Sequence, residues 1–334
     1  MFYRPIVIMP TVLRCDPKLF EKDLSGQVIV VTGSNSGCGL ETSRQLAKQG
    51  ATVVLACRNA SKGKAAVEDI GNKAVFLTTL DLSSLESVRG FASAFLDKYD
   101  RLDALVNNAG IMMCPYATTK DGFEMQFGCN HLGHFLLMRL LTPILLETAK
   151  KTGKPSRFVA LSSCASAQTT GRTKEHPHVD FEDPNWETRE YDEGMAYAQS
   201  KLSNYLHALG ASLEYPADKL ITASVHPGWV LSPLDQHITK KIFGEGMIAD
   251  TLASLMRKLF LWKGDIITPE DGAQTTLQCL LADDIESGKF YSQFGIYKDD
   301  ASKPGAWPMK HPNPNATEEN AKKLWALSNG LVGI

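Results

Sequence analysis

A β-branched run that leads into three spaced glycines constrains this chain more than any other part of its sequence. The stretch VIVVTGSNSGCGLETS covers residues 28–43 and places Gly33, Gly37 and Gly39 between the apolar run and an amphipathic segment. Glycine permits a tight turn and lets bare backbone N–H groups approach an anion at the positive end of a helix. The pattern therefore predicts a strand, a turn that holds the phosphates of a dinucleotide, and a helix that begins near Leu40.

An alternation of strands and helices continues from Gln27 to about Val225. Short apolar segments typical of strands are QVIVV, ATVVLA, KAVFLTTL, LDALVNN, RFVALSS and LITASVH. The segments between them, such as SLESVRGFASAFLDKYD and HLGHFLLMRLLTPILLETAKK, have the period and length of helices. Strands that are apolar on both faces and alternate with helices predict right-handed crossovers around a buried parallel sheet, which is a doubly wound α/β domain.

No linker or internal repeat divides the chain, so we expect a single domain. We assign residues 1–23 to an N-terminal extension and residues 24–334 to the domain. Two stretches, near residues 164–194 and 234–265, break the rhythm and are interpreted as substrate loops. The second contains the apolar segment TLASLMRKLFLW, which either packs on the sheet or covers an apolar ligand or a membrane surface. Thr317 is the predicted N-cap of a closing helix.

Composition argues against several function classes. The formal charge of −2 and the 22% of charged residues show no electrostatic bias toward nucleic acid. The seven scattered cysteines form no CxxC pair or compact Cys/His cluster, which argues against a metal site and indicates a reducing, cytoplasmic location unless a targeting segment precedes the chain. The apolar run at the N-terminus is broken by Pro5 and Pro10 and is too short to span a membrane.

Seven short motifs occur in the order and spacing of one enzyme family. They are TGSNSGCG at residues 32–39, Asp81-Leu82, NNAG at residues 107–110, Asn130 in NHLGHF, LSS ending at Ser163, YAQSK at residues 197–201 and Pro227-Gly228. Through them the chain resembles the short-chain dehydrogenase/reductase family from about Leu24 to Phe294. The segments ACRN, LDLSSLESVR, NHLGHFLL and HPGWV make it similar to the branch of retinol dehydrogenases, the WW-domain oxidoreductase and the protochlorophyllide reductases. The resemblance implies a Rossmann domain with a mostly parallel, seven-stranded sheet and helices on both faces.

The resemblance also implies the catalytic residues Ser163, Tyr197, Lys201 and Asn130. Tyr197 and Lys201 are four positions apart, so their side chains lie on one face of a helix. Lys201, together with the positive nicotinamide of an oxidised cofactor, would lower the pKa of the Tyr197 phenol from about 10 toward neutrality. In the family, the serine orients the reacting oxygen, and the asparagine holds a water that connects the lysine to solvent.

Each of these residues also has a plainer interpretation. A tyrosine and a lysine at this spacing often form a surface pair, and a serine at the end of a strand often serves only a turn. Ser162 competes with Ser163 for the catalytic role, although the family pattern favours the second serine. Without the resemblance, Asn130 would be interpreted as a helix cap. His131 and His134 are more simply packing or capping residues than a metal pair.

The sequence favours NADP(H) over NAD(H) as the cofactor. Proteins that prefer NAD generally place a carboxylate at the end of the second strand. This chain has Arg58 there and Lys62 nearby, and an arginine fork suits a phosphate dianion. The plainer role for Arg58 is stacking on the adenine ring without discriminating between the cofactors.

The other cofactor contacts follow from the resemblance. Asp81 is expected to accept a hydrogen bond from the adenine amino group, unless it merely caps the next helix, and Asn107 is expected to support the sheet and the cofactor. Ser232 stands where the family has a threonine that contacts the nicotinamide amide. The predicted cofactor-binding residues are Gly33, Ser34, Asn35, Ser36, Gly37, Gly39, Arg58, Asp81, Leu82, Asn108, Ala109, Gly110, Tyr197, Lys201, Pro227, Gly228, Val230 and Ser232.

The predicted function is hydride transfer between NADP(H) and an apolar alcohol or carbonyl compound, such as a retinoid or another lipid or xenobiotic carbonyl. One alternative is a double-bond reductase similar to the protochlorophyllide enzymes, although Trp229 stands where we expect a cysteine in that group. Another is a catalytically inactive family member that binds the nucleotide as a sensor or scaffold. The intact set of Ser163, Tyr197 and Lys201 argues against it.

The resemblance leaves the assembly of the protein open. Many relatives form homodimers through the helices that precede and contain the YxxxK motif, whereas members of this branch are often monomeric or attached to a membrane. The N-terminal anchor of many retinol dehydrogenases is not found in this sequence. We therefore expect no transmembrane segment, and peripheral membrane contact is the alternative to a fully cytoplasmic protein.

Overall fold

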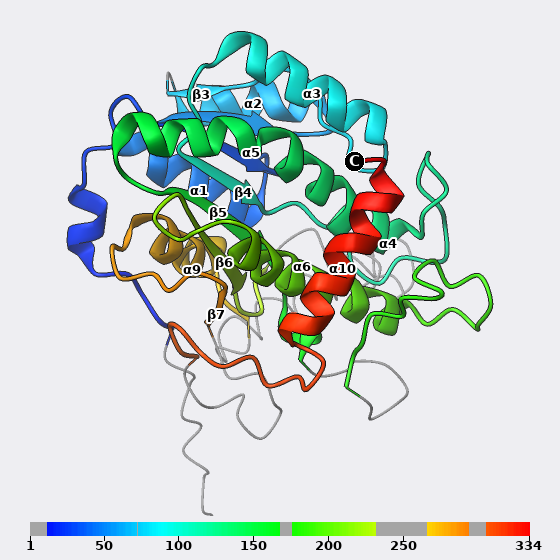
Figure 1. The fold of residues 1–334 in the computed structure, drawn as a ribbon. Helices are drawn as coiled ribbons and strands as arrows, with labels where there is room; N and C mark the ends of the chain where they lie inside the picture. The colour runs from blue at the N-terminus through cyan, green and yellow to red at the C-terminus, as the bar shows by residue number, and fades with distance from the viewer. Residues whose placement is uncertain (1–11, 72, 168–175, 232–265, 294–304) are drawn as a thin grey trace, which may run out of the picture.

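One seven-stranded sheet forms the centre of the protein (Figure 1). The computed structural model describes residues 12–71, 73–167, 176–231, 266–293 and 305–334. The strands are β1 (Val28–Thr32), β2 (Thr52–Ala56), β3 (Ala74–Val75), β4 (Ala104–Asn107), β5 (Ser156–Leu161), β6 (Leu220–His226) and β7 (Lys289–Ser292). Their spatial order is β3-β2-β1-β4-β5-β6-β7, and each neighbouring pair is parallel. This topology confirms the predicted doubly wound α/β domain.

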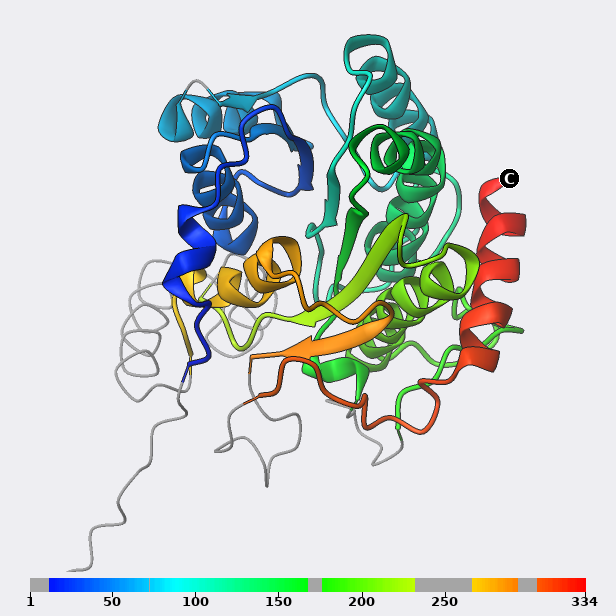
Figure 2. The same ribbon diagram turned by 60° about the vertical axis from the view of Figure 1, so that its left-hand side comes forward.

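A layer of helices covers each face of the sheet, as Figure 2 shows. The first layer consists of α3 (Leu85–Lys98), α5 (Gly133–Thr152), α6 (Glu193–Glu214) and α10 (Glu318–Val332). The second consists of α1 (Gly37–Lys48), α2 (Ala60–Ile70), α9 (Pro269–Leu281) and the short 3-10 helix η1 (Pro17–Glu21). The predicted arrangement of helices on both faces is therefore confirmed.

The β-branched strands explain why both faces of the sheet are buried. In β1, Val30 is fully buried in the core under α3, α5 and α6, whereas Val31 is fully buried in the core under α1 and α9. Successive side chains of a strand point to opposite faces, so a strand between two helical layers needs apolar residues at every position. Full burial of a side chain of this size contributes about 1.5–3 kcal/mol to folding.

The third strand is shorter than the sequence predicts. The segment KAVFLTTL predicts a strand over residues 73–80, but β3 spans only Ala74–Val75. The ring of Phe76 packs on Gly63 in α2, where an added Cβ would lie 2.5 Å from a ring carbon. The chain returns to β2 at an isolated bridge made by Thr79. Packing of an aromatic ring on a helix glycine has therefore replaced ladder pairing at this edge of the sheet.

The longest apolar helix begins earlier than the sequence predicts. The segment HLGHFLLMRLLTPILLETAKK predicts a helix over residues 131–151, whereas the continuous helical segment spans Met125–Thr152. It consists of α4 (Met125–Phe127), one π-helical turn (Gly128–Leu132) and α5. Among the described helices this segment alone is long and apolar enough to cross a membrane, but 72% of its apolar window is buried inside the protein, as in a core helix.

The described part of the N-terminal extension, residues 12–23, lies against α9 and the residue that follows β7 (Figure 2). The N–H group of Leu13 donates to the side-chain oxygen of Gln293 at 2.7 Å, and the amide nitrogen of Gln293 donates back to the Leu13 oxygen at 2.9 Å. The N–H group of Cys15 donates to Oε1 of Gln274 at 3.0 Å. These residues pack on the domain through paired hydrogen bonds.

The closing helix α10 begins at the predicted cap. The Thr317 hydroxyl accepts from the N–H group of Asn320 at 3.2 Å. The helix lies along α6, and its Trp325 meets the ring of Phe135 in α5 with centroids 5.1 Å apart. Helix α10 therefore covers part of the surface of α5 and α6, and a homodimer formed through that covered surface would have to displace α10.

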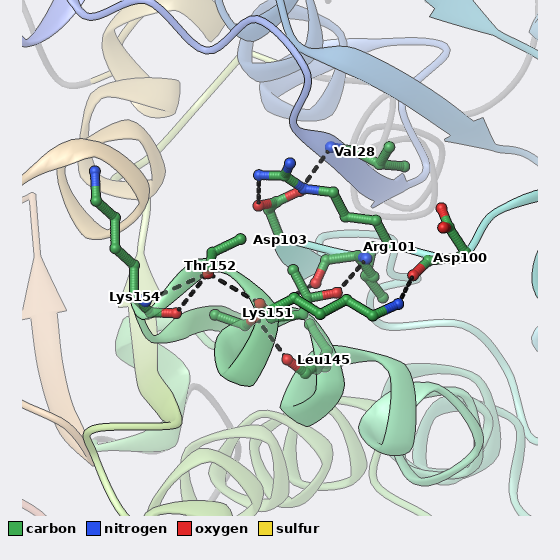
Figure 3. Close-up of polar contacts among 11 residues, drawn as sticks. Val28, Asp100, Arg101, Asp103, Leu145, Lys151, Thr152 and Lys154 are labelled. Carbon is green, nitrogen blue, oxygen red and sulfur yellow. Dashed lines mark hydrogen bonds and ion pairs between the residues drawn. The ribbon is translucent and has the colours of Figure 1, made fainter.

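Polar contacts join the amino ends of the strands, at the edge of the sheet away from the predicted site residues (Figure 3). Asp103, which precedes β4, accepts from the N–H group of Val28 at 2.8 Å and from Nε of Arg101 at 2.7 Å. Its main-chain oxygen accepts from the N–H group of Arg157 in β5 at 2.9 Å. These bonds fix the register of β1, β4 and β5 without using the loops at the carboxyl edge.

Candidate active site

The predicted catalytic and cofactor residues gather at the carboxyl edge of the sheet, after β1, β4, β5 and β6, with Arg58 after β2 and Asp81 beyond β3. The chain order reverses between β1 and β4, and open α/β sheets bind ligands at such a switch point. Ser163 follows β5, and Tyr197 and Lys201 lie on α6, which connects β5 to β6. Asn130 lies in the π turn that precedes α5. The loop after β5, helix α6 and the π turn therefore bring the four predicted catalytic residues to this edge of the sheet.

The glycine turn leaves the start of α1 open to an anion. Gly33 and Gly37 have φ angles of +65° and +57°, a region that favours glycine. Helix α1 begins at Gly37, before the predicted start near Leu40, and its N-cap Ser36 makes no side-chain capping hydrogen bond. By contrast, α2, α3, α6, α9 and α10 are capped by Asn59, Ser84, Asp192, Thr268 and Thr317. The start of α1 thus offers the free N–H donors and positive dipole that suit a phosphate.

Gly39 lets α1 lie against the loop that follows β4. A Cβ added at Gly39 would lie 2.3 Å from Nδ2 of Asn108 and 2.8 Å from the oxygen of Gly33. Nδ2 of Asn108 donates to the Thr32 oxygen at 2.8 Å. The Thr32 hydroxyl accepts from the N–H groups of Asn108 and Ala109, both at 2.9 Å. The predicted glycine turn and the NNAG segment therefore form one hydrogen-bonded unit.

A buried histidine joins this unit to the π turn. Nδ1 of His134 lies 2.9 Å from the main-chain oxygen of Asn130, and Nε2 lies 2.8 Å from Oγ1 of Thr32. A carbonyl oxygen only accepts, so Nδ1 carries the proton and the Thr32 hydroxyl donates to Nε2. Burial lowers the pKa of His134 to about 4, which keeps the ring neutral. Sequence reasoning predicted a packing or capping residue here and missed the bridge, because Thr32 lies 102 positions before His134.

Asn130 lies inside the π turn, and π turns are frequent at functional sites. Its buried side chain accepts at Oδ1 from the N–H group of Ile111 at 2.9 Å and donates from Nδ2 to the Ile111 oxygen at 3.0 Å. Nδ2 also lies 2.9 Å from Oγ of Ser200 in α6. The interpretation of Asn130 as a helix cap is wrong, because the helix begins at Met125 and this side chain bonds across to other segments.

Helix α6 presents the predicted tyrosine and lysine together. The Asp192 side chain caps the helix by accepting from the N–H group of Met195 at 2.9 Å. Nζ of Lys201 lies 5.7 Å from the centroid of the Tyr197 ring and donates to the Leu161 oxygen at 3.1 Å. Tyr197 is 7% exposed and Lys201 4% exposed. Burial of both side chains rules out the surface pair that this spacing often forms.

The same lysine lies beside Asn130. A Cβ added at Gly110 would lie 3.3 Å from both Oδ1 of Asn130 and Nζ of Lys201, so these two side chains flank Gly110. Lys201 and Asn130 therefore meet beside the NNAG segment, which is expected to hold the cofactor. Lys201 thus lies between the Tyr197 ring and the Asn130 side chain.

Burial governs the protonation of the tyrosine and the lysine. Burial raises the pKa of Tyr197, and a hydrogen bond with the Ser163 side chain opposes this rise. Burial lowers the pKa of Lys201 to about 8. The phenol therefore keeps its proton at neutral pH, which suits a proton donor. The predicted lowering of this pKa depends on the charge of Lys201 together with a bound oxidised nicotinamide, and it stays a prediction.

The structure separates the two candidate serines. The hydroxyl of Ser163 forms the hydrogen bond with Tyr197 and also accepts from the N–H group of Ala165 at 3.2 Å, where it caps a short 3-10 turn. The hydroxyl of Ser162 instead donates to the main-chain oxygen of Lys201 at 2.6 Å. Ser163 thus faces the tyrosine while also serving its turn, and Ser162 holds α6 against β5.

Arg58 follows β2, and Asp81 lies in the segment between β3 and α3. The two side chains are close enough for the charge of Arg58 to act on Asp81. Although burial opposes it, hydrogen bonds from Ser83 and the charges of Lys120 and Arg58 lower the pKa of Asp81. Ser84 caps α3, so the interpretation of Asp81 as its cap is wrong. Arg58 is exposed and makes no ion pair with another described residue, which leaves its guanidinium open to an anion.

The segment after β6 closes the site on its other side. Gly228, after Pro227, has a φ of +92°. A Cβ added at Gly272 in α9 would lie 2.4 Å from a methyl group of Val230, so this segment packs tightly on α9. Ser232 and the second predicted substrate loop lie outside the described residues.

Residues 176–194, the longer described part of the first predicted substrate loop, are held on α6. The side-chain oxygen of Gln199 accepts from the N–H group of Asp180 at 3.3 Å and from Arg189 at 3.2 Å. The Arg189 guanidinium lies 3.7 Å from the ring centroid of Trp186. Gln199 is a residue that sequence reasoning missed, although its place inside the YAQSK motif is a usable signal.

The arrangement suits proton transfer beside a nucleotide. A buried phenol, a lysine and a serine hydroxyl converge next to a turn with open N–H donors. Among the described residues no group of three His, Cys, Asp or Glu side chains could hold a metal ion. His131, paired with His134 in the sequence analysis, has Nε2 2.7 Å from Oγ of Ser328, which is a packing contact with α10.

Comparisons with known proteins bear on this site. The sequence model described as "short chain dehydrogenase" matches residues 27–173. Human retinol dehydrogenase 13 is 38% identical over 93% of this chain and 86% of its own length. Human retinol dehydrogenases 11 and 12 are each 39% identical over 93% of this chain, and the matches cover 87% and 88% of those proteins.

Solved structures share the fold. A protein from Mycobacterium paratuberculosis, described as uncharacterised, is 32% identical with a TM-score of 0.69, and the match covers 93% of this chain and 95% of that one. A 3-ketoacyl-(acyl-carrier-protein) reductase from Brucella melitensis complexed with NADH has a TM-score of 0.59 at 22% identity, over 81% of this chain and 97% of that one. A short chain dehydrogenase from Shigella flexneri complexed with NADP has a TM-score of 0.57 at 21% identity, over 82% and 99%.

Proposed function

This chain belongs to the short-chain dehydrogenase/reductase family and is retinol dehydrogenase-like, and from that premise we propose that it interconverts apolar alcohols and carbonyl compounds with NADP(H). As a family member it is an oxidoreductase that acts on alcohol or carbonyl groups with a nicotinamide cofactor. The choice of NADP(H), the apolar substrate and the roles of individual residues are our proposal. The observation that carries it is the convergence of Ser163, Tyr197 and Lys201, buried beside the open end of α1.

The nicotinamide, when bound, supplies or accepts a hydride at the substrate carbon. In the direction of carbonyl reduction, the Tyr197 hydroxyl donates its proton to the substrate oxygen, and the Ser163 hydroxyl holds that oxygen by a hydrogen bond. The positive charge of Lys201, 5.7 Å from the Tyr197 ring centroid, stabilises the phenolate that remains. Asn130, beside Lys201 at Gly110, continues the path by which the proton is replaced.

The cofactor-binding residues keep the roles predicted from the sequence. We propose that Gly33 to Gly39 and the start of α1 hold the pyrophosphate, and that Asp81 and Leu82 contact the adenine. We further propose that the NNAG segment lies along the ribose of the nicotinamide. The residues that complete this set are Asn108, Ala109, Gly110, Pro227, Gly228, Val230 and, outside the described residues, Ser232. Support comes from the positive φ angles of Gly33, Gly37 and Gly228 and from the uncapped start of α1.

The preference for NADP(H) is assigned to Arg58. Its exposed guanidinium lies close enough to Asp81 to lower the pKa of that carboxyl, and Lys62 follows in the first turn of α2. We predict that Arg58→Asp lowers kcat/KM for NADPH about tenfold relative to NADH, because one charged hydrogen bond to the phosphate is replaced by repulsion. Steady-state kinetics with both cofactors measures this ratio. An unchanged ratio in Arg58→Asp, with Lys64→Asp as the surface-charge control, would show that Arg58 does not read the phosphate.

An apolar substrate is favoured by the side chains around the tyrosine. Met112 and Met113 pack against the small cluster of Ala165, Tyr197 and Ala198. Trp229, directly after the Pro-Gly pair, is 60% exposed. The printed names of the relatives make retinol and its aldehyde the first compounds to try.

Two rival functions make different predictions for one assay. Purified protein is incubated in the dark with NADPH and with aliphatic, aromatic and retinoid aldehydes, and NADPH oxidation is followed by the loss of its absorbance. We expect turnover, with the highest kcat/KM for the long apolar aldehydes. Tight NADPH binding without turnover of any aldehyde would overturn the proposal. Protochlorophyllide under illumination would then separate a double-bond reductase from an idle nucleotide-binding scaffold.

Location and assembly complete the proposal. We retain the cytoplasmic location, which the scattered cysteines favour, and all seven thiols are free in the structure. Sedimentation with phosphatidylcholine vesicles tests the alternative of peripheral membrane contact. A homodimer is retained only through faces other than that covered by α10, and analytical ultracentrifugation distinguishes it from a monomer.

A further inference from the structure

Two non-glycine residues with left-handed backbone conformations lie at the two ends of one contact network. Among the described residues, Met113 has a φ of +49° and Trp186 a φ of +61°, and neither is a glycine, asparagine or aspartate. A side chain with a Cβ makes this conformation unfavourable, so it persists where the surroundings impose it. Such residues gather at functional sites, which makes the contacts of Met113 worth following.

A buried glutamine holds the backbone of Met113. Oε1 of Gln126 accepts from the N–H group of Met113 at 2.8 Å. Nε2 of Gln126 donates to the hydroxyl of Tyr191 at 2.9 Å and to the main-chain oxygen of Glu193 at 3.0 Å. The glutamine side chain is fully buried, and each of its polar atoms has a partner. Gln126 therefore ties the segment after the NNAG motif to the segment that leads into α6.

A buried carboxylate fixes the tyrosine in this network. The hydroxyl of Tyr191 lies 2.8 Å from Oε1 of Glu124, and that carboxylate also accepts from the N–H groups of Gln126 and Phe127 at the start of α4. Glu124 is fully buried, and the desolvation of its carboxyl makes each of these donors costly to lose. Tyr191 thus donates to Glu124 and accepts from Gln126, which leaves its ring a single position.

The second left-handed residue packs on the same tyrosine. The rings of Trp186 and Tyr191 meet edge to face with centroids 5.6 Å apart, and the Arg189 guanidinium covers the other ring surface of Trp186 at 3.7 Å from its centroid. Tyr116, from the segment that follows Met113, packs on Tyr191 with centroids 5.2 Å apart. The first substrate loop and the segment of Met113 are therefore joined through Tyr191.

The end of the network lies beside the reacting group. Met113 and its neighbour Met112 pack against the cluster that contains the Tyr197 ring. Methionine is flexible and polarisable, so it adapts its shape to an apolar surface. A substrate whose oxygen meets the Tyr197 hydroxyl would lay the carbon chain next to its carbonyl along these methionines.

We propose that Met113 is a specificity-determining residue for long apolar substrates, and that Gln126 and Tyr191 are positioning residues that hold it beside Tyr197. This inference rests on the proposed function and names the substrate class of the same site. A short aldehyde, such as hexanal, contacts mainly Tyr197 and Ser163. A long polyene aldehyde, such as retinaldehyde, also contacts Met113 and therefore depends on the network.

Three variants probe the network at different points. Met113→Gly removes the side chain and suits the left-handed backbone, so the fold is preserved. Gln126→Met keeps the length of the side chain but cannot accept from the N–H group of Met113. Tyr191→Phe removes only the hydroxyl. The matched control is Tyr215→Phe, which removes a half-buried hydroxyl bonded to Thr142, under the distant Trp325 of α10.

The readout is the ratio of kcat/KM for retinaldehyde to that for hexanal, with NADPH saturating. We expect Met113→Gly and Gln126→Met to lower this ratio about tenfold and Tyr191→Phe to lower it less, because lost apolar contact is worth about that factor. Tyr215→Phe leaves the ratio unchanged. The inference is overturned if all three network variants keep the wild-type ratio, or if Tyr215→Phe changes it equally. Thermal melting shows whether each variant is folded.

A second measurement separates this inference from the proposed function. If the wild type turns over no aldehyde, the proposed function fails, and the inference is then decided by titrating the NADP-loaded protein with retinol and following retinol fluorescence. Weaker retinol binding by Met113→Gly and Gln126→Met, but not by Tyr215→Phe, supports the role of Met113. Equal affinities in all four proteins contradict it.

Discussion

The π turn and α6 carry two buried clusters that differ in what their polar atoms meet. The residues that we propose to be catalytic, called the catalytic cluster below, are Asn130, Ser163, Tyr197 and Lys201. The histidine cluster consists of His131, Phe135, Phe158, His207 and Trp325. Asn130 and His131 are adjacent in the chain, yet their side chains belong to different clusters. The comparison shows what distinguishes a reactive site from a core that happens to contain titratable groups.

The histidine cluster is held by ring packing. The ring of His207 lies 5.1 Å from that of Phe135 and 4.9 Å from that of Phe158, measured between centroids. Nε2 of His207 and Nδ1 of His131 are buried and have no hydrogen-bond partner among the residues that the structure describes. Burial lowers the pKa of His131 to about 3 and that of His207 well below its ordinary value. These neutral rings serve as aromatic side chains.

The catalytic cluster is equally buried, but its polar atoms face one another. Tyr197 is hydrogen-bonded to Ser163, and Lys201 lies beside both Tyr197 and Asn130. Shifted pKa values occur in both clusters, so a shifted pKa alone does not identify the site. We propose that the convergence of a phenol, a cation and a hydroxyl at the carboxyl edge of the sheet marks the site.

The largest expected effect comes from removing the catalytic lysine. Lys201→Met keeps most of the side-chain volume and removes the charge beside Tyr197. We predict a loss of kcat of about 10²–10⁴-fold, because the phenolate formed in each turnover loses its stabilising cation. Steady-state kinetics with NADPH and retinaldehyde measures it. A folded Lys201→Met protein with more than a tenth of wild-type kcat would contradict the role given to this lysine.

Titration of Lys201 should change stability and activity in opposite directions as the pH rises. Its pKa of about 8 lies below the unfolded value of about 10.4, so the unfolded chain binds more protons between these two values. The free energy of unfolding therefore rises with pH from about 8 to 10, by up to 1.4 kcal/mol per pH unit relative to Lys201→Met. Carbonyl reduction instead falls above pH about 8, about tenfold per pH unit, as the charge is lost.

Chemical denaturation of both proteins at several pH values measures the stability difference, and kcat/KM profiles measure the activity. The informative control is Lys201→Arg, because a guanidinium keeps its charge throughout this range. A falling activity limb that persists unchanged in an active Lys201→Arg protein would assign the limb to another group.

The smallest effect on turnover is expected in the histidine cluster. His207→Leu replaces a ring whose buried Nε2 has no partner, so kcat should stay within about twofold of the wild type. Its pKa is lower in the folded protein, so the unfolded chain binds more protons and stability falls as pH drops below about 6.5. Below pH 6.5, the free energy of unfolding of His207→Leu should therefore fall more slowly on acidification than that of the wild type, by up to about 1.4 kcal/mol per pH unit. Urea melts at pH 7 and 5.5 test this, and a tenfold loss of kcat would connect the two clusters.

The nucleotide side of the site is predictable from sequence because its residues act close to where they lie in the chain. The turn from Gly33 to Gly39 is fixed by backbone conformation, and the spacing of Tyr197 and Lys201 puts both on one side of a helix. These features depend on the local chain and on a well-marked motif. Even here two elements differ from prediction. The start of α1 packs through Gly39 against Asn108, and the short β3 ends where Phe76 packs on Gly63 of α2.

The substrate side depends on contacts between distant segments. Tyr191 meets Glu124 and Gln126, which lie more than sixty positions earlier in the chain, and nothing in the local pattern of either segment marks the pair. The π turn that aims Asn130 likewise follows from a buried cap at Glu124, whereas periodicity alone predicts a later helix.

The measurement that tests the account most directly is NADPH oxidation with retinaldehyde by wild type and Tyr197→Phe. Tyr197→Phe removes one hydroxyl and leaves the glycine turn, Arg58 and Lys201 in place. The account predicts that turnover is lost while NADPH affinity, measured by fluorescence titration, stays within a few-fold of the wild type. Turnover that survives in Tyr197→Phe, or NADPH binding that is lost with it, would contradict the assignment of Tyr197 as the proton donor.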